Sequence, residues 1–325
     1  MNIISKFKLF ASVGVGITFS LLNFNCSSNS NNESSSSDTS KLSPHIFVFG
    51  GKDKRNMVSS TDGYNPETNT WTSFRRMPEP RVGSCAVSYK NKIFVIGGWK
   101  GNVTNNNDVF YPEKNSWETK APMITPRISF GATCFNDKIY VIGGWRNNSS
   151  GVNEEYDIIQ DKWTAKTPMP TFREALGVAV ADSLIFAIGG INKDSVLNVN
   201  EAYNPLTDKW EQKAPMPTPR FGVGIATVNN LIYVIGGSNS KKSLNIVEMY
   251  DPKLNKWTTK SPMLTARQGM AVAVLNDLIY VIGGQINDTT ITDIVEVYDP
   301  IQDKWQSKAP IPTKRSDACA ASYNP

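Results

Sequence analysis

The sequence predicts an all-β fold, a six-bladed propeller in which each blade is a sheet of four antiparallel strands. Two observations carry this prediction. A double glycine ends an apolar, β-branched run six times, at intervals of 46 or 47 residues, and a Tyr, a Trp and an Arg then follow in that order. Turn residues separate these short runs. The repeated positions are Gly50-Gly51, Gly97-Gly98, Gly143-Gly144, Gly189-Gly190, Gly236-Gly237 and Gly283-Gly284; Tyr64, Tyr111, Tyr156, Tyr203, Tyr250 and Tyr298; Trp71, Trp117, Trp163, Trp210, Trp257 and Trp305; and Arg81, Arg127, Arg173, Arg220, Arg267 and Arg315.

One unit shows how the four strands are predicted. After Arg220, residues 222–228 form the first strand, and Asn229-Asn230 makes a two-residue hairpin turn into the second, residues 231–235. The third strand runs into Tyr250, where an Asp-Pro pair breaks it, and the fourth begins near Trp257. Such a sheet cannot bury both faces alone, so six of them are expected to stack around an axis.

The two ends of the repeat region predict a closed ring. Residues 45–49 form a second strand that lacks its first strand, and residues 316–323 form a first strand that lacks its second. Pairing the two completes the sixth sheet and removes two open edges at once.

Double glycine, Tyr and Trp in units of about 47 residues resemble the kelch repeat, over residues 45–325. The third strands of the last three units also carry the Glu-x-Tyr ending of that repeat, at Glu201, Glu248 and Glu296. One such motif would be weak, but six in register are specific. Closure by the last strand resembles the C-terminal clasp of kelch propellers.

The N-terminus has the pattern of a targeting segment. Lys6 and Lys8 precede an apolar run at residues 9–24, which is short for a membrane span, and Cys26 follows at once. A stretch rich in Ser and Asn continues to residue 40, and its composition favours a flexible tether. We therefore expect a signal peptide at residues 1–25, a tether at residues 26–44 and the propeller at residues 45–325.

This arrangement resembles a bacterial lipoprotein signal. The resemblance implies a lipid on Cys26 and a place in the cell envelope as an outer-membrane lipoprotein, on the surface or the periplasmic side. Asn25 stands where the family pattern has a small residue. A plain secretory signal, giving a secreted or periplasmic protein, and an uncleaved anchor remain the alternatives.

The charge of the chain limits its possible partners, and its cysteine content limits its possible disulfides. The formal net charge is +5, and no block of Lys and Arg marks a nucleic-acid site, so no nucleic-acid partner is expected. Besides Cys26 the sequence has Cys85, Cys134 and Cys319, an odd number that cannot form a complete disulfide framework. We expect all three to be free thiols in strands, and the propeller to be monomeric.

Most repeated residues have structural explanations. The double glycines suit a sharp exit from a strand, the Tyr and Trp rings suit the wedge between sheets, and the Arg side chains suit loop carbonyls. Alternatively, the Arg side chains form a charged ring at the channel mouth. Strand directions put the double-glycine loops and the loops before each Arg on one face, where sequence varies most between units, as expected of a binding surface.

Two Trp residues on that face are not required by the repeat. Trp99 and Trp145 directly follow double glycines in neighbouring blades, with Lys100 and Arg146 beside them. In kelch adaptors the residue after the double glycine and the residue after the Arg line a peptide-binding mouth. The resemblance therefore adds further candidate residues to this rim, and we expect the rim to bind a protein or glycan ligand. The alternative for the two Trp residues is that they only pack against the rim and contact no ligand. These additional candidates are Lys52, Glu174, Phe221 and Gln285.

The sequence favours a binding module over an enzyme. His45 is the only histidine, which leaves no pair of His ligands for copper, no zinc site and no His-dependent triad. We expect no cofactor and no metal. The alternative is a periplasmic carbohydrate-modifying enzyme similar to the kelch-type sialic-acid epimerases, with Glu174 and the Arg ring supplying the chemistry.

Overall fold

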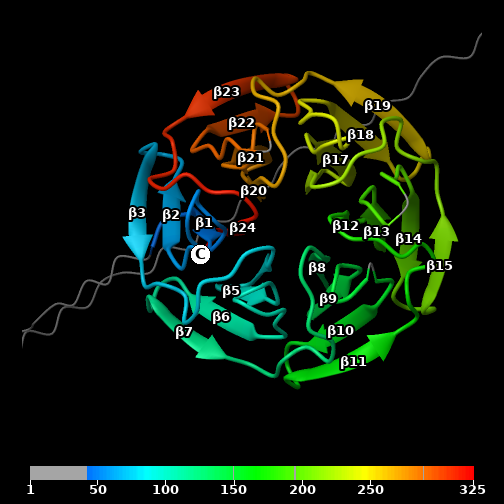
Figure 1. Ribbon diagram of the computed structural model, residues 1–325, viewed down its shortest axis with the longest axis horizontal. Coiled ribbons are helices and arrows are strands. Elements are labelled where there is room, and N and C mark those ends of the chain that lie inside the picture. The colour runs from blue at the N-terminus through cyan, green and yellow to red at the C-terminus, as the bar shows by residue number, and fades with distance from the viewer. Residues whose placement is uncertain (1–41, 149, 194, 288) are drawn as a thin grey trace, which may run out of the picture. The chain divides into compact units, whose positions relative to one another are not determined.

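The computed structural model describes residues 42–148, 150–193, 195–287 and 289–325. These residues form six four-stranded antiparallel sheets around a central axis, so the predicted six-bladed propeller is confirmed (Figure 1). The expected signal peptide, the tether up to residue 41 and Cys26 lie outside the described residues. Among the described residues no helix has the length and apolar character needed to cross a membrane.

The first three blades contain β1 to β11 together with the last strand, β24, and the strands of each blade are given from the innermost to the outermost. Blade 1 consists of β24 (Cys319–Tyr323), β1 (His45–Phe49), β2 (Thr61–Asn65) and β3 (Thr70–Phe74). Blade 2 consists of β4 (Cys85–Tyr89), β5 (Lys92–Ile96), β6 (Asn107–Tyr111) and β7 (Ser116–Thr119). Blade 3 consists of β8 (Gly131–Phe135), β9 (Lys138–Ile142), β10 (Asn153–Asp157) and β11 (Lys162–Lys166).

The remaining three blades repeat this arrangement. Blade 4 consists of β12 (Gly177–Ala181), β13 (Leu184–Ile188), β14 (Asn200–Asn204) and β15 (Lys209–Gln212). Blade 5 consists of β16 (Gly224–Val228), β17 (Leu231–Ile235), β18 (Val247–Asp251) and β19 (Lys256–Lys260). Blade 6 consists of β20 (Ala271–Leu275), β21 (Leu278–Ile282), β22 (Val295–Asp299) and β23 (Lys304–Lys308).

The hairpin between the two inner strands of blade 5 forms as the sequence predicts. Val228 pairs with Leu231 across the turn, and both turn residues have left-handed backbones, with φ of 51° at Asn229 and 61° at Asn230. Asparagine tolerates this conformation better than most residues, and two successive positive φ values match the twist of the flanking strands. The turn therefore fixes the register of the pair.

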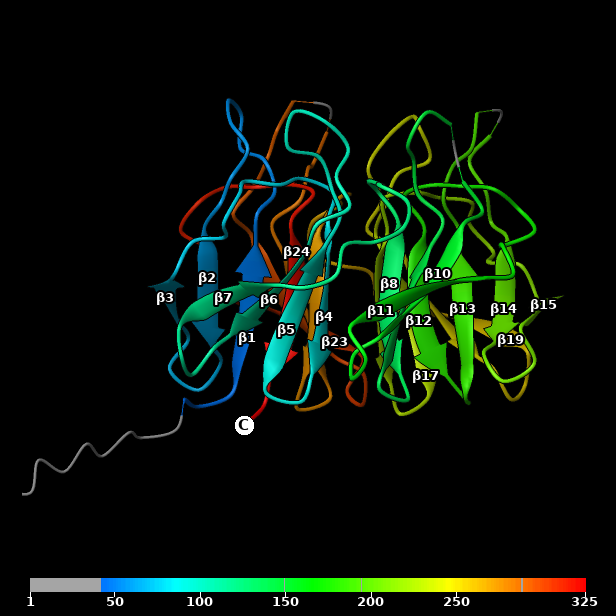
Figure 2. The same ribbon diagram turned by 90° about the horizontal axis from the view of Figure 1, so that it is seen from below.

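The ring closes where the first and last strands meet. β1 pairs with β24 over five residue pairs, from His45 opposite Tyr323 to Phe49 opposite Cys319. Figure 2 shows that the described chain enters and leaves the propeller at the same face, here called the lower face. The predicted closure is confirmed, and the pairing gives β1 a hydrogen-bonded neighbour on each side, with β24 as the innermost strand of the blade.

Each blade is attached to the preceding blade by two side chains of its outer hairpin. In blade 1 the Trp71 indole N–H donates to the carbonyl of Ala309 (2.9 Å), while the Asn69 side-chain oxygen accepts from the N–H of that same residue (2.9 Å). Both polar groups of one backbone residue are thus satisfied across the interface. The equivalent residues held in this way are Arg75, Ala121, Thr167, Ala214 and Ser261.

Five of the six repeated Tyr rings are fully buried against the outer Trp, but Tyr111 is not. Phe110 takes its position, opposite Trp117 with ring centroids 5.0 Å apart, and is fully buried. Tyr111 is half-buried and its hydroxyl donates to Glu118. Phe110 stands seven residues before Trp117, the same spacing that separates Tyr from Trp in the other five blades, whereas Tyr111 lies one residue later. The repeat position is therefore held by Phe110, and the expectation for Tyr111 was wrong.

The six repeated Arg side chains are buried ion-pair partners. Arg220 has no exposed surface; its guanidinium donates to Glu248 (2.5 Å) and to the carbonyl of Val234 (2.9 Å). Each Arg thereby ties the loop before an inner strand to the third strand of the same blade. The other pairs are Arg81–Asp108, Arg127–Glu154, Arg173–Glu201, Arg267–Glu296 and Arg315–Asp62.

The apolar core is divided among the blade interfaces. Six clusters of buried side chains occur, one at each interface, and the cluster between blades 1 and 6 joins Ile46 and Val48 to Tyr280 and Ile282. Each sheet therefore depends on its two neighbours for burial, as in other radial repeat architectures.

A chain ending at Arg315 should fail to form a stable ring. Loss of β24 leaves β1 with an unpaired edge and removes part of the core at two interfaces. We expect aggregation or loss of cooperative unfolding, measured by calorimetry and light scattering. A chain ending at Tyr323, which lacks only two exposed residues, should behave as the full chain does. Equal melting temperatures for the Arg315-truncated and full-length proteins would contradict closure by β24.

Candidate functional site

The face opposite the chain ends carries two sets of loops and is here called the upper face (Figure 2). One set follows the double glycines and joins the second strand of each blade to its third. The other set leads from an outer strand, through the buried Arg, to the inner strand of the next blade. This distribution of loops is the one expected from the strand directions.

Six short antiparallel bridges surround the channel mouth on this face. In each bridge, the residue after the double glycine pairs with the residue after the Arg. Trp99 and Val82, for example, exchange two backbone hydrogen bonds of 2.9 and 3.1 Å. The bridges bring the candidate residues of different blades into one ring. They are Lys52–Ser316, Val82–Trp99, Ile128–Trp145, Glu174–Ile191, Phe221–Ser238 and Gln268–Gln285.

Inside the bridges, backbone hydrogen bonds run around the axis in a closed circle. The N–H of Ser129 donates to the carbonyl of Gly83 (3.0 Å), and the series continues through each blade until Gly83 donates to Asp317 (2.9 Å). All six residues have positive φ, between 51° and 64°, which favours glycine. The circle couples every blade at the mouth and fixes the positions from which the loops project. Its members are Gly83, Ser129, Ala175, Gly222, Gly269 and Asp317.

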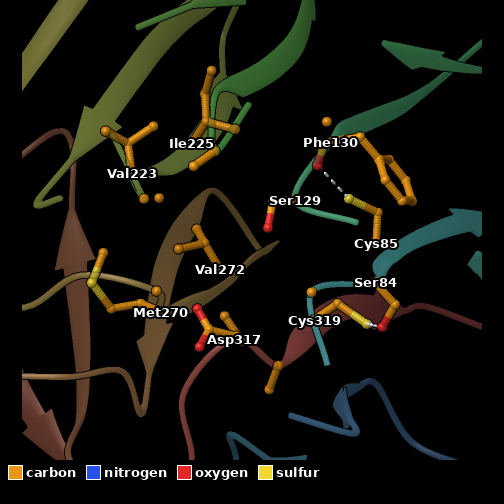
Figure 3. Close-up of a pocket in the computed structure, with 18 of the residues that line it drawn as sticks. Ser84, Cys85, Ser129, Phe130, Val223, Ile225, Met270, Val272, Asp317 and Cys319 are labelled. Atoms are coloured by element: carbon orange, nitrogen blue, oxygen red, sulfur yellow. Dashed lines mark hydrogen bonds between the residues drawn. The ribbon is translucent and has the colours of Figure 1, made fainter. Parts of the chain in front are cut away.

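A cavity of about 240 Å³ lies at this circle, lined by the circle and by the start of the inner strands (Figure 3). Alanines line it in blades 1 to 3 (Ala320, Ala86 and Ala132), whereas Val178, Ile225 and Val272 line it in blades 4 to 6. A second cavity of about 250 Å³ extends along the inner strands from Ala86 to Ser88. Most residues that line the first cavity are small and uncharged, and Asp317 is its one charged side chain, so positively charged groups that could contact a ligand belong to the rim above it.

The two additional Trp residues lie on the rim, as expected from their sequence positions. Trp99 and Trp145 are each 38% exposed, although their backbones are held in bridges. They follow Gly98 and Gly144, where a Cβ would lie within 2.9 Å of a carbonyl oxygen of the facing loop. The backbone is thus fixed closely beneath each ring while the ring itself contacts solvent.

The Lys and Arg side chains at the rim differ in whether their charge is already paired within the protein. Lys52 pairs with Asp317 (3.1 Å) and Lys100 pairs with Glu79 (2.5 Å), so both charges are partly satisfied within the protein. Arg146 is exposed and forms no ion pair within the described part of the chain. Of the cations beside the two Trp residues, Arg146 is therefore the one available to a ligand.

The remaining candidates lie in other sectors of the same ring. Glu174 is half-buried in blade 4, and burial raises the pKa of its carboxyl group. Phe221 in blade 5 and Gln285 in blade 6 are half-buried within their bridges. The candidate residues thus surround the mouth rather than converge on one point, and Lys52 and Glu174 belong to opposite blades.

Two upper-face residues were missed by the sequence analysis. Phe172 is 56% exposed and packs over Gly151 of the loop that carries Trp145. Asp317 is the acidic member of the inner circle and contacts Lys52. Both are exceptions to their repeat positions, which could have revealed them. Pro80, Pro126, Pro219, Ala266 and Lys314 occupy the position of Phe172 in the other blades.

The interpretation of the Arg residues as a charged ring at the mouth is wrong. Every one of the six guanidinium groups is at most 1% exposed and is paired with a third-strand carboxylate. The epimerase-like alternative depended on these cations acting with Glu174, so it loses its proposed cationic partners. Within the described residues, no group of three or more His, Cys, Asp or Glu side chains could hold a metal ion.

The chain belongs to the kelch-repeat family. The family model of the KLHDC2/KLHL20/DRC7 Kelch-repeats domain matches residues 25–190 and 129–325, which together include the whole propeller.

Shorter segments resemble three curated proteins. Beta-scruin of Limulus polyphemus is 43% identical over 58 residues, and alpha-scruin of the same organism is 38% identical over 58 residues. The F-box/kelch-repeat protein At1g67480 of Arabidopsis thaliana is 36% identical over 59 residues. Each match covers 18% of this chain, but only 6% of either scruin and 16% of the Arabidopsis protein.

The three propeller cysteines should remain free thiols. Cys85 and Cys319 line the upper cavity without a disulfide, and the Cys85 thiol donates to the carbonyl of Phe130 (3.0 Å; Figure 3). Burial raises the pKa of Cys134 and of Cys319 to about 11, which disfavours the reactive thiolate at neutral pH. Alkylation of unreduced protein should label all three only after denaturation, as read by mass spectrometry. A Cys85–Cys319 bridge in that spectrum would contradict this expectation.

Proposed function

We propose that this protein is an exported, membrane-tethered lipoprotein of the cell envelope whose upper face binds protein or glycan ligands. Kelch propellers typically mediate protein interactions, which gives the general class. The observation that carries the proposal is the pair of half-exposed rings, Trp99 and Trp145, on a rim whose backbone is fixed by hydrogen bonds. Rigid aromatic anchors lose little entropy on binding and often dominate the energy of interfaces.

The arrangement of loops supports binding at this face. The upper loops differ in sequence from blade to blade, while the buried Arg pairs and the circle beneath them repeat. Variable loops on a repeated, rigid base are the usual design of recognition surfaces. Neither Trp ring is needed to fill a blade interface, because a second set of six Trp residues does that.

The point of chain entry is compatible with tethering. Leu42 packs beneath blade 1, and the Ser43 hydroxyl accepts from the side chain of Asn65 in a lower-face turn. The described chain therefore begins at the lower face, opposite the Trp-bearing rim. A lipid on Cys26 would be joined to the propeller through this entry point.

Lipid attachment can be tested by metabolic labelling with a radioactive fatty acid. The wild-type protein should incorporate label, and the Cys26→Ser variant should not, because no sulfur remains to accept the acyl group at that position. The same variant should also leave the membrane fraction. Equal labelling of both proteins would refute the tether.

Ligand binding can be tested with a Trp99→Ala, Trp145→Ala double variant. We expect an almost unchanged melting temperature, because neither ring fills a blade interface, and a loss of ligand affinity of at least about tenfold, or about 1.4 kcal/mol. Cross-linking of the tagged full chain to its partners in intact cells, compared with the wild type, measures the loss.

Trp163→Ala is the matched control. Trp163 is buried, packs against Tyr156 with ring centroids 4.9 Å apart and donates its indole N–H to the carbonyl of Ala121 (2.7 Å), so its loss should cost about 3–5 kcal/mol of stability. If the double variant is destabilised like Trp163→Ala yet retains its cross-links when folded, the two rim residues are structural and the proposed face is wrong.

A further inference from the structure

The loops that follow the double glycines are strongly basic. Lys or Arg occurs at eight positions in these loops, with at least one in each of blades 1 to 5. The same loops contain four acidic residues, Asp53, Asp194, Asp288 and Asp293, so basic residues outnumber acidic ones two to one. The basic residues are Lys52, Lys54, Arg55, Lys100, Arg146, Lys193, Lys241 and Lys242.

Most of these charges are not neutralised by the protein. Lys52 and Lys100 have ion-pair partners, as described above. The other six are exposed, and none forms an ion pair within the described residues. Four of the six extend over blades 3 to 5: Arg146, Lys193, Lys241 and Lys242.

The lower face differs in charge. Its turns between the third and fourth strands carry six Lys residues and eight Asp or Glu residues. The exposed lysines there, such as Lys209 and Lys253, alternate with carboxylates of the same turns. The excess of positive charge therefore belongs to the upper loops and not to the molecule as a whole.

Exposed aromatic rings lie among the upper cations. Trp145 directly precedes Arg146, and Phe172 packs over Gly151 of the same loop. Trp99 occupies the neighbouring blade. Blades 2 to 5 thus present apolar rings and unpaired positive charges side by side, a combination that suits a ligand carrying both apolar and anionic groups.

Carboxylates at the mouth restrict the kind of anion. Glu174 in blade 4 and Asp317 in blade 1 belong to opposite sides of the ring. A uniformly charged polyanion, such as a sulfated glycan, would place like charges over them. A polypeptide can instead place neutral residues there and acidic residues over the cations, and its apolar side chains fit the aromatic rings.

From this arrangement we infer that the upper face binds an acidic, extended segment of a partner polypeptide across blades 2 to 5. Its carboxylates contact Arg146, Lys193, Lys241 and Lys242, and its apolar side chains pack on Trp99, Trp145 and Phe172. The inference rests on the proposed binding function and specifies its ligand class.

Three probes test the ligand class by fluorescence anisotropy on the full chain. The first is a labelled peptide of alternating Asp or Glu and Leu or Pro, the second is its twin with Asn and Gln in place of the acids, and the third is labelled heparin. The acidic peptide should bind at least about tenfold more tightly than its amide twin. Its affinity should fall as ionic strength rises from about 0.01 M to about 0.15 M, which shortens the Debye length from about 30 to about 8 Å.

Charge-reversal variants with equal net charge locate the site. Arg146→Glu, Lys241→Glu, Lys242→Glu should weaken binding of the acidic peptide at least about tenfold. Lys209→Glu, Lys253→Glu, Lys304→Glu on the lower face should change it less than about twofold. All six side chains are exposed, and circular dichroism checks that both variants fold.

Each contrary outcome overturns a defined part of the inference. Equal affinity for the acidic peptide and its amide twin removes the role of charge, and equal effects of the two triple variants remove the upper location. Tight heparin binding without peptide binding makes the ligand a glycan. If the acidic peptide does not bind but cross-linking in cells still depends on Trp99 and Trp145, the acidic ligand is refuted while the proposed binding function stands.

Discussion

The contact by which each blade holds one backbone residue of its predecessor is the constraint on which the ring depends. A Trp indole N–H and an Asn or Asp oxygen satisfy the carbonyl and the N–H of a single residue just beyond the preceding outer strand. Because the same contact occurs at all six interfaces, neighbouring sheets meet in the same way at each of them. At the closing interface it joins residues about 240 positions apart, Asn69 and Ala309.

Two further constraints act at the upper face. The buried Arg pairs attach the loop before each inner strand to the third strand of the same blade, and the circle of backbone hydrogen bonds attaches neighbouring blades to one another. Breaking a buried ion pair by removing one partner costs about 3–5 kcal/mol, since the other charge stays unpaired. The sequences of the upper loops can therefore change without displacing the Arg pairs or the circle of hydrogen bonds beneath them. This explains why the exposed residues of the rim are also the ones that vary between blades.

The sequence predicted the fold closely because its signals are local and repeated. Gly-Gly exits, two-residue polar turns such as Asn229-Asn230 and alternating strands depend on neighbouring residues, so the repeated copies reinforce one another. The strand register of blade 5 and the closure by β24 were obtained in this way. Trp99 and Trp145 were placed on the rim for the same reason.

The details that the sequence did not reveal depend on contacts between distant residues. In blade 2 the position seven residues before the Trp holds Phe110 and not Tyr111, as the pairing opposite Trp117 shows. The burial of the six Arg residues depends on carboxylates in another strand, at Glu248 for Arg220. Lys100 likewise gains its partner, Glu79, from a different loop. Spacing within a repeat carries no information on such pairs.

The pairing of His45 with Tyr323 has a consequence for the topology of the chain. Since the first and last strands are neighbours in one sheet, the order of the blades around the axis does not depend on where the backbone is interrupted. A short linker between these ends, with a new break in a lower-face hairpin such as Asn229-Asn230, would yield a circular permutant that keeps every interface and every upper loop. In this architecture the covalent order of the repeats and their spatial order are separable.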